Sequence, residues 1–214
     1  MNSELLRLLE VMDRLRSPGG CPWDAEQSHE SLLKYLLEES YEFVDAVDEN
    51  DRQAMREELG DILLQVYFHS RIAEEHPTDP FSIEDVAAGI ADKLIRRHPH
   101  VFGEVNVSGS EEVLANWEKL KAVEKKRNSA TDGVALSQPA LPLITKLIYR
   151  AEKNGIKLDL PTADIDNGVS SEVAISDALV AAVVAAIKQG IEPEDLLRAR
   201  AREIAEEIKR IESL

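Results

Sequence analysis

The sequence predicts an all-α fold, a helical bundle followed by a degenerate helical C-terminal repeat. Hydrophobic residues make up 43% of the 214 residues but aromatic residues only 5%, so the core must consist mainly of Leu, Ile, Val and Ala. Such a composition favours helices over sheets. Apolar residues also recur at three- and four-residue spacing, and no segment alternates apolar and polar residues as a half-buried strand would.

Three amphipathic helices are predicted first. Residues 3–16 carry leucines on one side and end at the Ser17–Gly20 turn, after which a loop continues to Asp24. Residues 28–48 and 51–75 each have a continuous apolar stripe. The stripe predicted to face the core in residues 28–48 consists of Leu33, Leu36, Leu37, Tyr41, Val44 and Val47. The stripe of residues 51–75 consists of Met55, Leu59, Ile62, Leu63, Val66 and Tyr67.

Two further helices complete the first part of the chain. Ser82 and Asp85 form a capping-box pattern, which predicts a helix over residues 83–97. Residues 111–127 are acidic at their start and basic at their end, as the helix dipole prefers. We therefore predict a first domain over residues 1–127.

The remaining residues are predicted to form a linker and a smaller domain. Residues 128–142 are the linker, and residues 143–214 carry three shorter helical patterns, at 143–154, about 171–189 and 193–213. The segment that begins Ala174-Ile175-Ser176-Asp177 resembles the earlier segment that begins Glu58-Leu59-Gly60-Asp61. The later copy lacks the first acid, and no acidic cluster precedes it, so the second domain is expected to lack the acidic site of the first.

Charge and cysteine content limit the classes of partner. The chain has 25 basic and 41 acidic residues, and a net charge of −16 repels nucleic-acid backbones and anionic membranes. Cys21 is the only cysteine, which excludes an intrachain disulfide and is typical of the cytosol. The apolar run Leu179–Ile187 is about half of the ~20 residues that a membrane span needs. We expect a cytoplasmic protein with no nucleic-acid or membrane partner.

Two carboxylate clusters stand out, Glu38-Glu39-Ser40-Tyr41-Glu42 and Glu58-Leu59-Gly60-Asp61. Acids three residues apart share one face of a helix, and acids that flank an apolar stripe are partly buried when helices pack. Partly buried acids need partners, and an oxygen-rich set of this size suits Mg²⁺ or Mn²⁺ better than zinc. For any one acid, a solvated helix face is an equally good explanation. A di-iron site is disfavoured, because it requires two Glu-x-x-His triplets and the chain has one, Glu26 with His29.

Basic and aromatic residues suggest a phosphate-bearing ligand. Lys93, Arg96 and Arg97 lie together at the end of a predicted helix, where they either satisfy the helix dipole or bind phosphate. Trp117 and Lys121 lie four residues apart, so they either belong to a helix core or contact a nucleotide. The sequence has no glycine-rich phosphate loop. Phosphate recognition would therefore depend on a metal and these bases.

These motifs resemble a known superfamily. A Glu-Glu-x-x-Glu motif followed by Glu-x-x-Asp is similar to the signature of the all-α nucleoside triphosphate pyrophosphohydrolases. The segments Gly20–Asp24 and Arg96–Phe102 resemble those of its MazG branch, and the likeness covers about residues 5–127. The resemblance implies a MazG-like catalytic domain that hydrolyses (d)NTPs between the α- and β-phosphates. Its expected specificity is broad, as in housecleaning of the nucleotide pool. It also implies Mg²⁺ dependence, with Mn²⁺ as an alternative, and a homodimer whose helices pack across subunits; a higher oligomer is left open.

The resemblance assigns roles residue by residue. Glu39, Glu42, Glu58 and Asp61 match the metal ligands of the family. Glu38 matches an additional acid that positions or deprotonates the attacking water, so Glu38, Glu39 and Glu42 are the expected catalytic residues. The expected substrate-binding residues are Lys93, Arg96, Arg97, Trp117 and Lys121.

Two alternatives remain open at this point. One is an enzyme of the same superfamily with a narrow substrate, such as a dUTP/dCTP hydrolase or a phosphoribosyl-ATP pyrophosphatase. The other is a non-catalytic nucleotide-binding or regulatory helical module, which the degenerate second half of the chain suggests.

Overall fold

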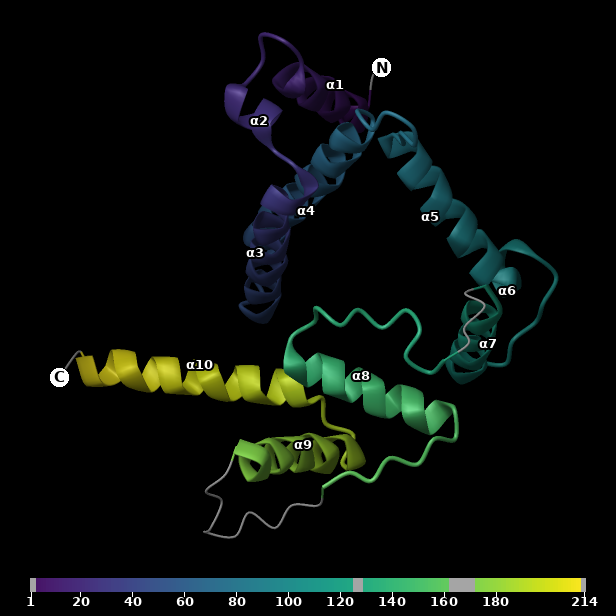
Figure 1. Ribbon diagram of the computed structural model, residues 1–214, viewed down its shortest axis with the longest axis vertical. Coiled ribbons are helices and arrows are strands. Elements are labelled where there is room, and N and C mark those ends of the chain that lie inside the picture. Colours follow the sequence, from purple (N-terminus) through teal and green to yellow (C-terminus); the bar gives the residue numbers. More distant parts are fainter. Residues whose placement is uncertain (1–2, 125–128, 162–171, 213–214) are drawn as a thin grey trace. The chain divides into compact units, whose positions relative to one another are not determined.

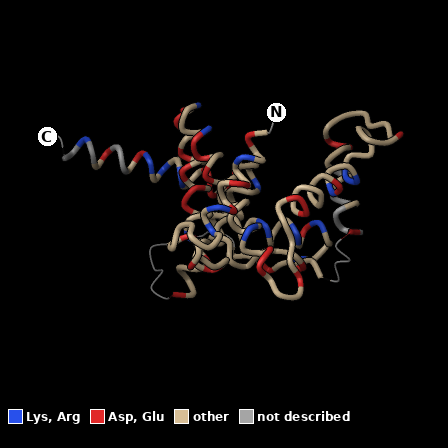
Figure 2. The backbone as a smooth tube through the Cα atoms, turned by 90° about the horizontal axis from the view of Figure 1, so that it is seen from above, with Lys and Arg blue, Asp and Glu red and all other residues tan. Residues whose placement is uncertain are grey.

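The computed structural model describes residues 3–124, 129–161 and 172–212, and these residues form helices and loops with no strand. This confirms the predicted all-α class. The chain divides into two compact units, Met1–Ser110 and Glu111–Leu214 (Figure 1). Acidic and basic residues occur along both units (Figure 2). The functional boundary predicted at residue 127 stays a prediction, and the helix around residues 110–124 is grouped with the second unit.

The first unit contains six helices among its described residues. They are α1 (Glu4–Arg16), α2 (Pro22–Glu26), α3 (His29–Asp48), α4 (Arg52–Ala73), α5 (Ile83–Arg97) and α6 (Pro99–Phe102). The long helices match the predicted segments to within two residues. The short helix α2 begins in a segment that was expected to be a loop, and α6 follows the predicted end of α5. Each has proline in its first turn, a position that needs no backbone N–H from the proline.

Helix-capping side chains explain where α3, α4 and α5 begin. The Ser28 hydroxyl accepts a hydrogen bond from the backbone N–H of Ser31, and the Asp51 carboxylate accepts two from the first turn of α4. The predicted capping box of Ser82 and Asp85 is present at the start of α5. These caps fix the ends of the helices that carry the acidic clusters.

The α3–α4 hairpin is the centre of the first unit. The two helices lie side by side along most of their length, joined by a tight turn in which Asn50 has a left-handed φ of 55° (Figure 1). Helix α1 packs on α4, and the buried cluster joins Met12 of α1, Leu32 of α3, and Tyr67 and Phe68 of α4. The core therefore lies at the open end of the hairpin, far along both helices from the turn.

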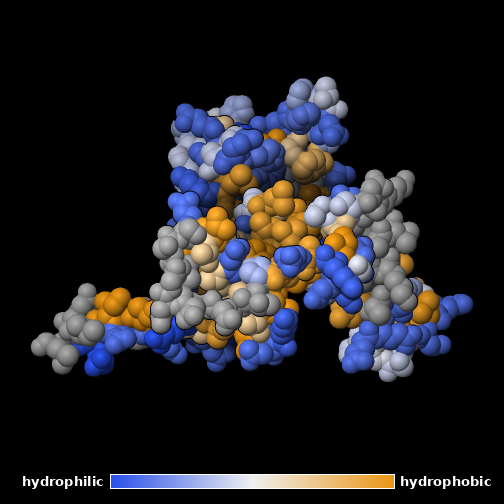
Figure 3. Space-filling model, turned by 60° about the horizontal axis from the view of Figure 1, so that its bottom comes forward, coloured by the Kyte–Doolittle hydropathy of each residue, from blue (hydrophilic) through white to orange (hydrophobic). Residues whose placement is uncertain are grey.

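The core stripe predicted for α3 is wrong. Leu33, Leu37 and Tyr41 are 53%, 59% and 45% exposed, whereas Leu32 and Ala46 are buried. Helix α3 is apolar on more than one side, and the single chain buries only the side that faces α4. On α4 the predicted Tyr67 is buried, but Leu59 is exposed. Broad apolar areas are consequently open at the surface (Figure 3).

The loop between α1 and α3 is held by Arg16. Its guanidinium, 6% exposed as a side chain, donates two hydrogen bonds to the Glu75 carboxylate and two to the carbonyls of Asp24 and Gln27. The Arg16 hydrogen bond holds the pKa of Glu75 below its ordinary range. Trp23, in the same loop, contacts the rings of Tyr35 and Phe68 edge-on. Arg16 thus ties α2 to the end of α4.

The second unit contains α7 (Ser110–Glu124), α8 (Ala140–Lys153), α9 (Glu172–Lys188) and α10 (Pro193–Glu212) among its described residues. Helices α8, α9 and α10 contact one another, and Ile148, Ala181 and Val183 are buried in the unit. Helix α8 begins three residues earlier than predicted. In the described part of the chain, no single helix is long and apolar enough to cross a membrane, although α9 with the first part of α10, bent by 108°, reaches that composition as a pair.

We predict that Arg16→Met lowers the free energy of unfolding by about 2 kcal/mol, because the substitution leaves Glu75 and two carbonyls without their donor. Urea unfolding followed by circular dichroism measures this loss. Arg7→Ala is the matched control, since Arg7 forms only an exposed pair with Glu4 and its removal should change stability little. An equal loss of unfolding free energy in the two variants would show that Arg16 does not stabilise the contact between α2 and the end of α4.

Candidate metal centre

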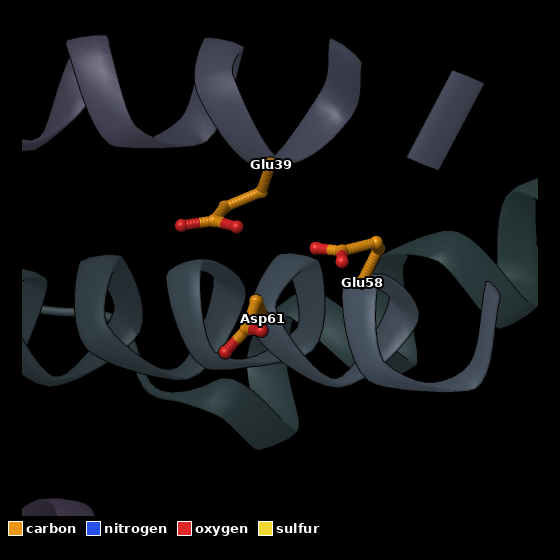
Figure 4. A group of neighbouring side chains, drawn as sticks. All are labelled: Glu39, Glu58 and Asp61. Carbon is orange, nitrogen blue, oxygen red and sulfur yellow. The ribbon is translucent and has the colours of Figure 1, made fainter. Parts of the chain in front are cut away.

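Three carboxylates meet between α3 and α4. Glu39 extends from α3 toward α4, and Glu58 and Asp61 extend from one turn of α4 to meet it (Figure 4). One oxygen from each of the three side chains lies within 4.8 Å of the other two. All three are partly buried, as expected for acids that border an apolar stripe. In the described part of the chain this is the one such group of acids, histidines or cysteines.

The geometry follows from the spacing of the acids and the antiparallel packing. Glu58 and Asp61 lie three residues apart, so they project from the same face of α4. Because α3 runs antiparallel to α4, Glu39 is opposite that face although it is nineteen residues before Glu58 in the chain. The sequence could place Glu58 and Asp61 on one helix face, and the hairpin brings the third carboxylate, Glu39, opposite them.

The group carries concentrated negative charge without compensation. Burial raises the pKa of Glu39, and the neighbouring charges of Asp61, Glu42 and Glu58 raise it further. Burial likewise raises the pKa of Glu58, followed by the charges of Glu42 and Asp61. Among the described residues no Lys, Arg or His forms an ion pair with any of these acids. A cation would relieve the repulsion, and oxygen donors at this spacing fit a hard divalent ion.

The other two predicted acids lie beside the group. Glu42 is exposed and stands outside the closest three, but its charge and a hydrogen bond both act on Glu58. Glu38 is exposed, and its charge raises the pKa of Glu39. No described acid outside the five predicted ones joins the group.

The predicted phosphate-binding residues do not meet the acids within one chain. Lys93, Arg96 and Arg97 lie in the last turns of α5, and α5 contacts α4 and α6 but not α3 among the described elements. Lys93 is half-buried, Arg96 is exposed and Arg97 is 9% exposed. The distance between these bases and the acids depends on how α5 packs against the rest of the chain. No sequence pattern predicted that packing.

Trp117 and Lys121 lie on α7, in the second unit. Trp117 is half-buried. The side chain of Lys121 is outside the described residues. Their expected contact with a nucleotide stays a prediction.

Comparison with known proteins identifies the family. The sequence model of the MazG nucleotide pyrophosphohydrolase domain matches residues 27–102, which contain all five acids and the basic end of α5. The nucleoside triphosphate pyrophosphohydrolase/pyrophosphatase MazG of Thermotoga maritima is 37% identical over 97% of this chain and 85% of its own length. The chain belongs to the MazG family. It is therefore a member of a family of nucleoside triphosphate pyrophosphohydrolases, a class of hydrolase.

Other MazG relatives are longer than this chain. The nucleoside triphosphate pyrophosphohydrolase of Escherichia coli K12 is 44% identical over 72% of this chain, which spans 59% of that protein. A crystal structure of a mazG-related protein from Thermotoga maritima covers 54% of this chain and 97% of its own, at 31% identity and a TM-score of 0.46. The residues matched by the MazG domain model lie in the first unit and contain the acidic group.

We predict that Glu39→Gln stabilises the metal-free protein at neutral pH. The pKa of Glu39 is raised in the folded state, so the folded chain binds its proton more tightly than the unfolded chain. Stability from this group is present below the ordinary value of 4.5 and is lost as the pH rises through the raised pKa. The melting temperature in EDTA should therefore be higher in the variant at pH 7.5 and equal to wild type near pH 4.

The control for this prediction is Glu49→Gln, which removes an exposed charge at the end of α3 outside the acidic group. Its melting temperature should follow that of wild type at both pH values. A Glu39→Gln protein that melts at or below the wild-type temperature at pH 7.5 in EDTA would contradict the repulsion inferred at the site.

Proposed function

We propose that the protein hydrolyses (d)NTPs between the α- and β-phosphates to (d)NMP and pyrophosphate, with Mg²⁺ as the cofactor and Mn²⁺ as a substitute. The observation that carries this proposal is the group of Glu39, Glu58 and Asp61, whose oxygens converge and have no ion-paired base among the described residues. Membership of a pyrophosphohydrolase family supports the reaction type. The oxygen-only ligand set supports the choice of metal.

The acids divide the work between holding the ion and handling the water. Glu39, Glu58 and Asp61 hold the ion, and Glu42 adds a ligand from the next turn of α3. A divalent ion held there would make a bound water more acidic and would polarise a phosphoryl oxygen. Glu38, which is exposed beside Glu39, orients that water or accepts its proton.

Lys93, Arg96 and Arg97 are proposed to bind the triphosphate, because phosphoryl and nucleotidyl transfer depend mainly on positioning and charge neutralisation. Trp117 and Lys121 are proposed to contact the base and a phosphate. Since α5 does not contact α3 in one chain, a complete site needs the basic end of α5 to reach the acids from elsewhere. A second copy of the chain is the source that we propose.

Exposed apolar faces support a homodimer. Leu33, Leu37 and Tyr41 follow one another at four-residue spacing on α3, and all are exposed. Val86, Ile90 and Leu94 do the same on α5. Side chains of this kind at such spacing are typical of helix faces that pack against another helix. We propose that these two faces are covered in the dimer, which also places α5 of one subunit near α3 of the other.

The substrate range is proposed to be broad, as expected for cytoplasmic housecleaning of the nucleotide pool. The free thiol of Cys21 is compatible with a reducing compartment. Pyrophosphate release from a panel of all common (d)NTPs, with phosphoribosyl-ATP included, tests the range. Turnover confined to dUTP and dCTP, or to phosphoribosyl-ATP, would indicate an enzyme with narrow substrate specificity. Nucleotide binding without release, in Mg²⁺ and in Mn²⁺, would indicate a non-catalytic module.

We predict that Asp61→Asn and Glu42→Gln each abolish Mg²⁺-dependent pyrophosphate release while the helix content is kept. A loss on the order of 100-fold or more is expected when a metal ligand is removed. A coupled pyrophosphate assay and circular dichroism measure the two quantities. Glu49→Gln serves again as the matched control and should turn over like wild type. Wild-type turnover in Asp61→Asn would refute the metal assignment.

We also predict that Leu37→Glu converts the dimer to a monomer and reduces turnover. A carboxylate placed in an apolar interface is desolvated without a partner, which disfavours association. Light scattering coupled to size exclusion measures the mass, and the control is Leu5→Glu, which changes an exposed leucine on α1. A wild-type protein that is monomeric and active would refute the dimer, and a mass above that of a dimer would indicate a higher oligomer.

A further inference from the structure

Two histidines join the ends of α3 and α4 that lie away from the turn. His29 is the first residue of α3 and His69 lies in the last two turns of α4. Their Nδ1 atoms are 2.8 Å apart. The ring planes differ by 2° and the centroids are 5.1 Å apart, as expected for two imidazoles joined edge to edge in one plane. A short N–H···N hydrogen bond of this geometry requires one nitrogen to donate and the other to accept.

The surroundings of His69 decide which nitrogen donates. Its Nε2 is buried and has no hydrogen-bond partner. A proton on that nitrogen would be a buried donor with no acceptor among the described residues, which is unfavourable. The proton of His69 therefore belongs on Nδ1, which donates to the bare Nδ1 of His29. His29 is exposed, so its own Nε2–H can reach water.

The hydrogen bond spans the same hairpin that carries the acids. His29 is ten residues before Glu39 on α3, about 15 Å along the helix axis, and His69 is eight residues after Asp61 on α4. The histidines and the acids are thus paired in one antiparallel register, at two levels of the hairpin. A slip of one helix along the other would break the hydrogen bond and separate the carboxylates together.

We propose that His29 and His69 are a positioning pair that holds α3 and α4 in register and thereby sets the spacing of the carboxylates between them. The hydrogen bond adds to the apolar contacts at this end a constraint that needs one donor, one acceptor and one plane. The part of the proposal that concerns the carboxylates rests on the proposed metal-binding function. The tautomer assigned to the His29–His69 pair does not depend on that function.

Acid opens the pair. Burial lowers the pKa of His69, and the charge of His29 lowers it further. One added proton would either place two N–H groups head to head or, if the hydrogen bond were kept, put a donor on the buried Nε2 of His69. Glu30 is the carboxylate beside His29, and it accepts from its own backbone and from Ser28. Two ion pairs lie at the same end, Arg16 with Glu75 and Arg71 with Asp13.

The pair is tested first by nitrogen-15 NMR of the imidazoles in the full chain. We expect His69 in the Nδ1–H form at pH 7.5, with a shared-proton coupling to His29 and titration below its value in urea-unfolded protein. An Nε2–H form of His69, or titration of the two rings as in the unfolded chain, would overturn the proposal. This readout needs no metal, nucleotide or activity, so its result is independent of the proposed function.

The second test compares His69→Asn with His69→Leu. An Asn side chain can place an amide donor where Nδ1 lies, whereas Leu fills space without a donor. We expect Mn²⁺ affinity at pH 7.5 to be kept in His69→Asn and to fall by roughly threefold to thirtyfold in His69→Leu, the range for coupling through packed helices. Both are measured at a temperature at which circular dichroism shows each variant to be folded.

The outcomes of the second test are distinct. Equal Mn²⁺ affinity in His69→Leu and wild type would overturn the positioning role, and equal losses in both variants would overturn the role of the hydrogen bond. If wild type bound no Mn²⁺, the proposed function would fail, and the positioning role would fail with it, while the NMR result would still decide the tautomer.

Discussion

The antiparallel contact of α3 with α4 is the constraint on which the rest of the first unit depends. It places Glu39 opposite Glu58 and Asp61, although like charges at this range repel one another. The attraction that holds the helices together must therefore come from other residues of the hairpin. Burial of Leu32, Tyr67 and Phe68 supplies it at the open end, where α1 adds Met12. The acids are thus held close by packing that lies elsewhere.

Polar side chains also stabilise the fold at the open end of the hairpin. Arg16 joins the α2 loop to the end of α4, and its guanidinium lies 5.9 Å from the centre of the Phe68 ring. Trp23 covers the same ring from the loop. The MazG segment that contains Trp23 therefore has a structural explanation in this protein: it covers the core that opposes the repulsion of the acids.

The sequence predicted the parts of this arrangement that depend on local rules. The capping pair Ser82 and Asp85 placed the start of α5, and the spacing of Glu58 and Asp61 placed both acids on one face. It failed where a choice between faces was needed. Helix α3 has leucines at adjacent positions 32 and 33, and only packing decides which is buried. The distance between the bases of α5 and the acids could not be predicted either, because no local pattern encodes the angle between α4 and α5.

The two ends of the hairpin respond to acid in opposite ways. The raised pKa of Glu39 and the lowered pKa of His69 bring both titrations toward the interval between their ordinary values of 4.5 and 6.5. As the pH falls through this interval, protonation relieves the repulsion at the acids and stabilises the metal-free fold. Over the same interval His69 binds a proton more readily in the unfolded chain than in the folded chain, and this difference destabilises the fold. For the proposed cation both events would act in one direction, because a protonated Glu39 would no longer be an anionic ligand and an opened histidine pair would free the register. In the metal-free protein the two protonations therefore act on stability with opposite signs.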